Sequence, residues 1–299
     1  MTPTPANTAQ PDEDKAMHPT ISLVICTRNR AQYLDLTLDA LAALKLEQPW
    51  ELIVVDNGST DRTRERLEQF QSPPHCHFKI VDEPVPGLGK ARNRGWTSAT
   101  GEIVAFTDDD CYPAPEFLAD TIACFAADPT LGYVGGRVLL YDKNDYPVTI
   151  QPREEIVEIG ARAYIPAGLI HGANFSFRRT TLEAVGGFDE RFGAGRPFPC
   201  EDVDILARIS AEGWNGLYSP TPLVYHHHRR TAADAVHLHK GYDRGRGAYY
   251  AKCMLDRRLR ALYFRRWAYR LLHQPLGATL RELSAAARFL TLNIFTSPR

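Results

Sequence analysis

Short apolar runs alternate with amphipathic segments along the first third of the chain. Four runs are rich in β-branched side chains and have almost no polar interruption: 21–26, 51–56, 78–83 and 102–108. Continuous apolar runs are typical of strands buried on both faces of a parallel sheet. Helices are predicted between them, at 33–44, at 60–70 with Ser59 or Thr60 as N-cap, and beginning within 86–95. The pattern predicts an α/β fold, a mostly parallel sheet with helices on both faces.

The order of elements becomes mixed after Pro115. Here the pattern predicts helices at 116–127 and 202–213, and strands at 132–140, 171–178 and 223–228. Helical spacing returns near the end of the chain, so residues 233–299 are expected to form a helical extension of the α/β domain.

The composition is that of an ordinary globular protein. The chain has 299 residues, 44 % hydrophobic and 24 % charged, which excludes collagen-like, disordered and disulfide-scaffold proteins. None of the six cysteines forms a C-x-x-C pair, which argues against a zinc ribbon and for free thiols in a reducing cytosol.

No apolar run reaches the roughly 18 residues of a spanning helix. Residues 1–19 lack the apolar region of a signal peptide and are expected to be a disordered leader. A cytoplasmic protein is predicted.

The net charge of −1 conceals an uneven distribution. From Lys240 to Arg299 there are 13 Lys and Arg against 3 Asp and Glu, whereas the first 239 residues carry 22 against 33. An acidic body and a basic extension indicate different partners for the two parts.

The basic extension contains an apolar stripe at helical spacing: Leu255, Leu259, Leu262, Tyr263, Trp267 and Leu271. One interpretation is that this stripe packs on the preceding domain and leaves a solvated basic face. The other is an interfacial helix attracted to anionic lipid, which would hold the protein peripherally at the inner face of the membrane. Residues 276–295 add a second amphipathic segment, in which Arg281, Glu282 and Arg288 oppose a membrane-spanning helix.

Three adjacent carboxylates, Asp108, Asp109 and Asp110, follow the fourth predicted strand. They repel one another, and one divalent cation that also holds phosphate oxygens would relieve the repulsion. A solvated loop with a helix cap is the structural alternative. A phosphatase nucleophile motif is disfavoured because Cys111 and Tyr112 follow where it needs Thr or Val.

Polar residues also follow the first two predicted strands, where ligands of parallel sheets bind. Asp56 could accept hydrogen bonds from a nucleobase or a ribose hydroxyl, or it could close an Asx-turn. Thr27, Arg28 and Asn29 could line the same crevice.

A glycine-rich segment, 86–95, combines flexible backbone with Lys90, Arg92 and Arg94. Glycines and cations at a helix N-terminus suit a diphosphate. The signal is weak alone, because neither G-x-G-x-x-G nor G-x-x-x-x-G-K-[ST] is present.

Two further groups could carry chemistry. Glu201 and Asp202 open a predicted helix, where they could only complement its dipole or could supply a general base. His226, His227 and His228 could be solvated surface. In a strand, however, residues 226 and 228 would point the same way, as a metal ligand requires.

Taken together and in this order, the segments ICTRNR, VVDNGSTD, GLGKARNRG, DDD, HGANFSF, GGFDERF, ED and the final His-Arg segment resemble a family 2 glycosyltransferase. The resemblance covers residues 20–232. It implies the GT-A fold, with a Rossmann-like nucleotide-binding half over 20–115 and an acceptor-binding half over 116–232.

The resemblance also implies roles for single residues. Asp56 matches the nucleoside-binding aspartate, Thr27 and Arg28 the loop against the base, Arg92 and Asn93 an element near the nucleotide, and Asn174 the segment beside the donor sugar. The full set expected to bind the nucleotide sugar is Thr27, Arg28, Asn29, Asp56, Lys90, Arg92, Asn93, Asp108, Asp109 and Asn174.

The reaction implied is transfer of a sugar from a nucleotide diphosphate, most commonly UDP, to an acceptor hydroxyl with inversion. Asp202 matches the catalytic base, with Glu201 beside it. Asp110 matches the metal ligand, with His226 favoured over His228 as its partner and Mg²⁺ or Mn²⁺ as the cofactor. The expected acceptor is a saccharide or a lipid-linked saccharide, as in cell-surface polysaccharide or glycolipid synthesis, and no nucleic-acid partner is expected.

Two alternatives remain. A sugar-nucleotide pyrophosphorylase shares the sheet order but needs a glycine-rich turn after the first strand, where this chain has CTRNR. A non-catalytic carbohydrate-binding protein could keep the fold, although the intact DDD and ED argue against it. A processive synthase is disfavoured, because neither Q-x-x-R-W nor spanning helices are found.

Overall fold

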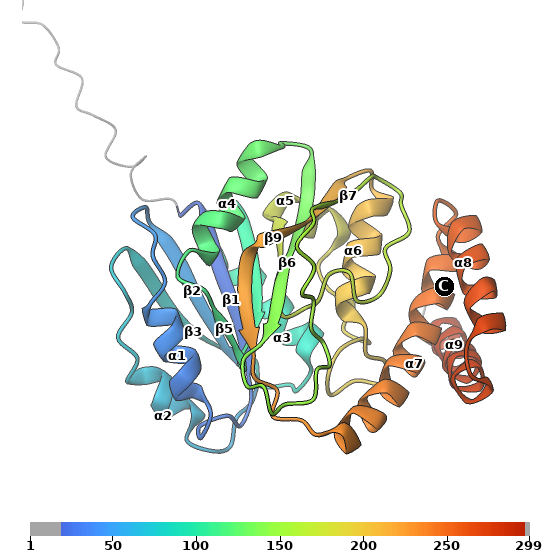
Figure 1. Cartoon of the computed structure of the whole chain (residues 1–299), viewed down its shortest axis with the longest axis horizontal. Helices are drawn as coiled ribbons and strands as arrows, with labels where there is room; N and C mark the ends of the chain where they lie inside the picture. Colours follow the sequence, from blue (N-terminus) through green and yellow to red (C-terminus); the bar gives the residue numbers. More distant parts are fainter. Residues whose placement is uncertain (1–18, 297–299) are drawn as a thin grey trace, which may run out of the picture.

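The computed structural model describes residues 19–296, so all but the last residue of the predicted leader lies outside the described part. Its strands form a nine-stranded sheet within this range (Figure 1). One half of the sheet is parallel, in the order β3-β2-β1-β4. These strands are β1 (Ile21–Thr27), β2 (Trp50–Asp56), β3 (Cys76–Asp82) and β4 (Ile103–Asp108). They lie where the apolar runs predicted them.

The other half of the sheet mixes directions. Its strands are β5 (Cys111–Pro113), β6 (Leu131–Leu140), β7 (Val157–Ile159), β8 (Phe175–Arg178) and β9 (Asn215–His226). The order continues β4-β8-β6-β9-β5, with β8 antiparallel to both of its neighbours and β6 parallel to β9. Strand β9 therefore pairs with three strands, β6, β5 and β7.

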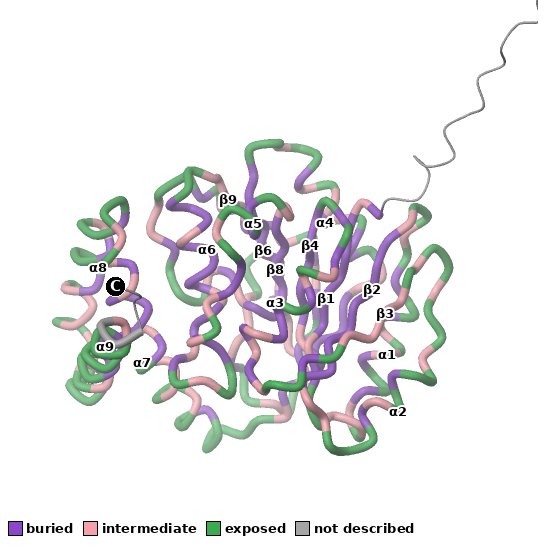
Figure 2. Tube along the Cα trace, turned by 180° about the vertical axis from the view of Figure 1, so that it is seen from behind, coloured by how far each residue is buried: buried purple, intermediate pink, exposed green. Residues whose placement is uncertain are grey.

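Helices cover both faces of the sheet, as predicted. They are α1 (Leu34–Ala42), α2 (Thr63–Glu68), α3 (Leu88–Ser98), α4 (Phe117–Ala127), α5 (Arg179–Val185) and α6 (Glu201–Ala211). Apolar residues of α1, α2 and α4 join one buried cluster, and those of α3, α5 and α6 join another. Figure 2 shows the central strands between these helices as largely buried. In α3, Gly95 allows close packing, because a Cβ there would lie 2.3 Å from a methyl group of Val24 in β1.

The helix predicted at 60–70 is shorter than expected, and neither predicted cap forms. It begins at Thr63 and has no side-chain cap. The Ser59 hydroxyl instead accepts a hydrogen bond from Asn29 N–H (3.0 Å), and Thr60 N–H donates to the Asn29 side chain (2.7 Å). These residues therefore link the loops after β1 and β2.

Two predicted strands also have different bounds. The strand predicted at 171–178 starts only at Phe175, because the N–H of Asn174 donates to the His171 carbonyl and closes a turn (2.9 Å). The strand predicted at 223–228 is the end of the longer β9 and stops at His226. His227 and His228 lie beyond it.

Three helices follow the α/β domain: α7 (Ala232–Leu255), α8 (Arg260–His273) and α9 (Leu276–Thr296). A capping box between Thr231 and Asp234 begins α7. Helices α7 and α9 pack closely, since a Cβ on Gly247 would lie 2.0 Å from the backbone oxygen of Glu282.

The predicted apolar stripe packs inward. Leu259, Tyr263 and Trp267 are buried in a cluster that also contains Phe192 and Val203 of the α/β domain, while Leu255 is exposed. The extension thus shares a core with the preceding domain, as the packing interpretation predicted. Within the described residues, no helix is both long and apolar enough to cross a membrane.

Candidate active site

The predicted site residues meet at the carboxyl ends of neighbouring strands. In the sheet register Thr27 pairs with Asp56, and Cys26, one position earlier on β1, pairs with Asp108. Asp109 and Asp110 form the tight turn between β4 and β5. Because β5 pairs with β9, this turn lies beside His226 at the end of β9.

The loops after β1 and β2 are held together by side-chain hydrogen bonds. Asp56 is buried and accepts from Ser59 N–H (2.9 Å), three residues on, so it closes the loop at the strand end one residue wider than the Asx-turn given as one interpretation. Asn57, which was not among the predicted site residues, donates to two backbone carbonyls and accepts from Gly87 N–H (2.8 Å). It ties the end of β2 to the glycine-rich loop. Arg28 is exposed on the neighbouring loop.

Arg92 is the central side chain of the site. It is 2 % exposed, and it pairs with Glu201 (2.7 Å) and Asp108 (3.0 Å). The same guanidinium donates to the Gly172 carbonyl (3.2 Å) and lies over the Phe175 ring. Arg92 thus joins the two halves of the domain, and its charge is matched by protein carboxylates.

Three other predicted donor-binding residues also contact protein groups. Asn93 donates to the Phe188 carbonyl and accepts from Phe188 N–H. Asn174 is buried and donates to the carbonyls of Arg137 and Pro222 (both 2.9 Å). Lys90 is half-buried on α3, with its Nζ 3.9 Å from a Glu83 oxygen. Both asparagines therefore position backbone segments around the site.

Asp109 and Asp110 share Arg30, which was not among the predicted site residues. Arg30 Nε lies 3.2 Å from Asp109, and its Nη2 lies 3.0 Å from Asp110. Burial raises the pKa of Asp109 to about 7 despite this arginine. Burial also disfavours ionised Asp110, but the hydrogen bond and charge of His226, together with Arg30, bring the pKa of Asp110 below its usual value.

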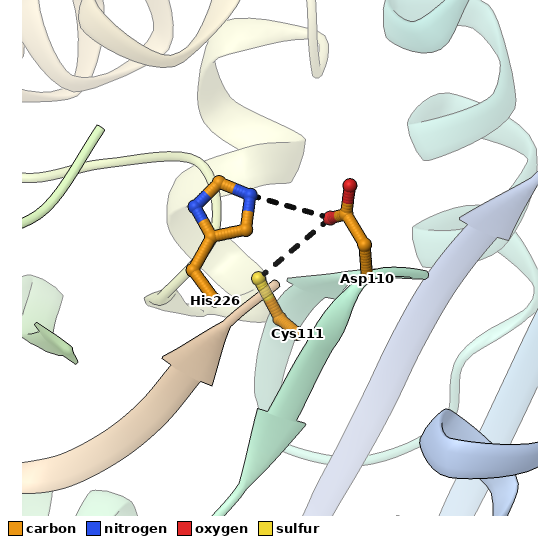
Figure 3. A group of neighbouring side chains, drawn as sticks. All are labelled: Asp110, Cys111 and His226. Carbon is orange, nitrogen blue, oxygen red and sulfur yellow. Dashed lines mark hydrogen bonds and ion pairs between the residues drawn. The ribbon is translucent and has the colours of Figure 1, made fainter. Parts of the chain in front are cut away.

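His226 and Asp110 form the candidate metal site (Figure 3). His226 Nε2 lies 3.4 Å from Asp110 Oδ1, while its Nδ1 faces the Thr149 hydroxyl (3.3 Å) and carbonyl (3.5 Å). Asp110, Cys111 and His226 present ligand atoms within 4.8 Å of one another. Burial raises the pKa of the Cys111 thiol well above its usual value, and sulfur is a softer ligand than Mg²⁺ or Mn²⁺ prefers. A carboxylate oxygen and an imidazole nitrogen fit Mg²⁺ or Mn²⁺.

His228 is oriented differently. Its Nδ1 accepts from Arg230 N–H (3.1 Å), and its buried Nε2 has no hydrogen-bond partner among the described residues. A neutral ring whose Nδ1 accepts must carry its proton on Nε2. His226 therefore has the geometry of a metal ligand, whereas the buried Nε2–H of His228 donates to no described residue.

Glu201 and Asp202 begin α6 on the opposite side of Arg92. Burial raises the pKa of Glu201, which pairs with that arginine, to about 7. Asp202 is half-buried and accepts from Gly172 N–H (3.1 Å) and from Val203 N–H (2.8 Å). These hydrogen bonds fix its carboxylate. His171, a residue within HGAN, was not among the predicted site residues. Burial lowers the pKa of His171, the charge of Asp202 opposes this shift, and the charge of His226 adds to it.

The sequence model of glycosyl transferase family 2 matches residues 22–186, more than half of the chain. The chain belongs to this family.

Relatives agree with this assignment. The chain is 29 % identical over 231 residues to the pre-mycofactocin glycosyltransferase of Mycobacterium tuberculosis, covering 73 % of this chain and 45 % of the relative. It is 27 % identical over 224 residues to the validoxylamine A glucosyltransferase of Streptomyces hygroscopicus, covering 65 % and 52 %. The chain thus spans about half the length of these family 2 relatives.

Solved structures share the fold. A mannosyltransferase from Pyrobaculum calidifontis in complex with GDP-Man and Mn²⁺ superimposes with a TM-score of 0.64 and 24 % identity, covering 94 % of this chain and 77 % of that one. S. aureus TarS 1–349 in complex with UDP gives a TM-score of 0.61 with 17 % identity, covering 93 % and 72 %. The family 2 chain therefore has the GT-A fold, with the predicted helices at its C-terminus.

Proposed function

We propose that this family 2 chain is a metal-dependent, inverting glycosyltransferase that moves a sugar from a nucleoside diphosphate to an acceptor hydroxyl. The observation that carries the proposal is the position of Arg92. It pairs with Asp108 of the aspartate turn and with Glu201, the neighbour of Asp202. The aspartates that would bind a cation and the carboxylate that would act as the base thus lie on the two sides of one buried guanidinium.

The leaving-group side is the aspartate turn with β9. Asp110 and His226 would hold Mg²⁺ or Mn²⁺, and the bound ion would neutralise charge that develops on the departing diphosphate. His228 Nε2–H would donate a hydrogen bond to a diphosphate oxygen, which would satisfy an atom that is buried and unpaired among the described residues. Preorganised donors of this kind favour the more highly charged transition state.

The acceptor side is the start of α6. Asp202 would accept the proton of the attacking hydroxyl, and the N–H groups of Gly172 and Val203 hold its carboxylate in one orientation. A positioned base typically contributes ~10²–10⁴ in rate. Glu201 is bound to Arg92 and buried, so we assign it a positioning role.

The donor is expected to be a nucleoside diphosphate sugar. Asp56 and Thr27 lie side by side at the strand ends, where α/β sheets bind nucleotides. The mannosyltransferase of the comparison binds GDP-Man, and TarS has been solved with UDP-GlcNAc. The first panel should therefore contain both UDP-sugars and GDP-sugars.

The test is release of nucleoside diphosphate from this panel, with Mn²⁺ or with EDTA. We expect release with at least one donor and none in EDTA. A pyrophosphorylase would instead form a nucleoside triphosphate when pyrophosphate is supplied, and a binding protein would release nothing. Either of these results would refute the proposal.

The base is tested with Asp202→Asn, which keeps the shape and removes the basicity. Turnover should fall by at least ~10² while donor affinity is retained. Asp39→Asn, an exposed aspartate on α1, is the matched control and should behave as the wild type. Normal turnover of Asp202→Asn would require a different base.

A further inference from the structure

The corner between α8 and α9 exposes large apolar side chains that the predicted stripe does not include. Tyr269, Leu272, Leu276 and Leu280 are 66 %, 81 %, 72 % and 58 % exposed. Tyr269 and Leu272 lie three residues apart near the end of α8, and Leu276 and Leu280 lie four apart at the start of α9, so each pair shares one face of its own helix on either side of the turn at 274–275. We name these four residues the apolar corner. It lies on the side of the molecule away from the sheet (Figure 1).

The segment that contains the apolar corner is rich in arginine and nearly free of acidic residues. Between residues 257 and 293 the only carboxylate is Glu282, which is fully buried and pairs with Arg246 and Arg270. Arg257, Arg265, Arg266 and Arg288 are exposed and form no ion pair with any described residue. Soluble surfaces normally mix both signs of charge, so this one is selective for an anionic partner.

A groove adjoins the apolar corner at Leu280. It has a volume of about 250 Å³ and lies between α7, α9 and the loop before α6. Leu280 belongs to both the corner and the groove, and Pro197 and Phe198 line the opposite wall. Arg244, Arg281 and Arg288 surround it, and of these only Arg281 pairs with a described carboxylate, Asp243. An apolar groove with a cationic rim suits a phosphate group attached to an aliphatic chain.

We propose that the apolar corner and this groove dock the protein on an anionic lipid bilayer, with one lipid headgroup phosphate held in the groove. Apolar side chains that enter the interface among arginines are the features of such binding. A second copy of the chain is disfavoured, because a symmetric contact would bring the unpaired arginines of both copies together. Docking on the bilayer does not depend on the proposed function. Delivery of a lipid-linked acceptor toward Asp202 by this docking rests on the proposed function.

The test is co-sedimentation of the full chain with vesicles of phosphatidylcholine, alone or mixed with phosphatidylglycerol. We expect binding only to the mixed vesicles, and weaker binding at high salt. Point variants are required, because truncating the helices would remove Phe289 and Trp267 from the shared core.

Two pairs of variants separate the contributions. Leu272→Ser with Leu276→Ser should reduce binding by at least tenfold, while Leu36→Ser, an exposed leucine on α1, should not. Arg244→Gln with Arg288→Gln should reduce it by about 25-fold, at about fivefold per arginine, while Arg62→Gln in the α/β domain should not.

Three results would overturn the proposal. They are equal binding of the leucine variant and the wild type, equal binding to both vesicle types, and no binding to the mixed vesicles. A dimer in solution that the leucine variant converts to a monomer, without vesicle binding, would assign the face to a second copy. Release of nucleotide from a soluble donor should be unchanged in every variant, so failure of docking is distinguishable from failure of the proposed function.

Discussion

At the carboxyl ends of the strands, two arginines, Arg30 and Arg92, pair with four carboxylates: Asp108, Asp109, Asp110 and Glu201. In the C-terminal helices the ratio is reversed. Two buried carboxylates, Asp243 and Glu282, pair with three arginines: Arg246, Arg270 and Arg281. The first region therefore has an excess of negative charge that a divalent cation would complete. In the second region the arginines outnumber the carboxylates, so its negative charges need no cation. The remaining positive charge of the helices is exposed.

The largest effect is expected at the bridge between the two halves of the α/β domain. Arg92→Met should cost about 3–5 kcal/mol of the free energy of unfolding, because it leaves buried carboxylates without their partner. Arg246→Met is the matched change in the helices. It should cost less, because Asp243 keeps Arg281 and Glu282 keeps Arg270. Urea unfolding measures both, and equal losses would contradict the comparison.

The next effect concerns the cation itself. At a Mn²⁺ concentration 100 times its dissociation constant, the wild type should gain about 2.7 kcal/mol of stability. Asp110→Ala should gain nothing, whereas Arg246→Met should gain as much as the wild type. Thermal unfolding with and without EDTA checks this, and a full gain in Asp110→Ala would place the cation elsewhere.

A smaller effect is expected in the pH dependence, with opposite signs in the two regions. The folded-state pKa of Asp109 is raised to about 7 by burial. Its protonated form therefore stabilises the fold at about pH 4 and below, and this contribution is lost as the pH rises toward 7. Asp109→Asn should therefore raise stability more at about pH 8 than at about pH 4. These measurements require EDTA.

Asp189, at the junction with the helices, should do the reverse. Burial would raise its pKa, but hydrogen bonds and charge from Arg191 and Lys252 hold the pKa of Asp189 well below its usual value. That stabilisation is present above the unfolded pKa of about 4 and is lost as the pH falls further. Asp189→Asn should thus cost stability at neutral pH and less in acid. The same sign for both variants would contradict this pair of predictions.

The smallest effect is expected on the outer face of α8. Arg265→Gln should change the free energy of unfolding by less than about 0.5 kcal/mol, since this exposed arginine has no ion pair with a described residue. A larger loss in urea unfolding would mean that the outer arginines support the fold.

Local patterns in the sequence predicted the strand ends well, because a buried strand must be apolar and its end is where polar residues return. Asp56 and Asp108 could therefore be placed at strand ends from the order of apolar and polar residues alone. Contacts between distant segments could not be predicted. Arg92 meets Glu201 from 109 positions away, and Asn174 meets Pro222 from 48 positions away; no periodicity encodes such pairs.

The extension shows the same division. Its apolar stripe was recognised from helical spacing. Whether the stripe packs in a core or faces a membrane depends on which residues cover it. Phe192 and Val203 of the α/β domain cover it, and neither is adjacent in sequence. The exposed corner was missed because Leu272 and Leu276 belong to two different helices.

The buried thiols provide built-in reporters of local opening. Burial raises the pKa of Cys111, Cys200 and Cys253 well above the usual value, so an alkylating reagent reacts with them only when their surroundings open. Cys111 lies beside Asp110, Cys200 directly precedes Glu201, and Cys253 belongs to the core shared with the helices. The labelling rates of Cys111 and Cys253 would therefore time the opening of the candidate cation site and of the helical junction separately in one molecule. Cys200, which belongs to the same buried cluster as Cys253, would report this junction next to the proposed base.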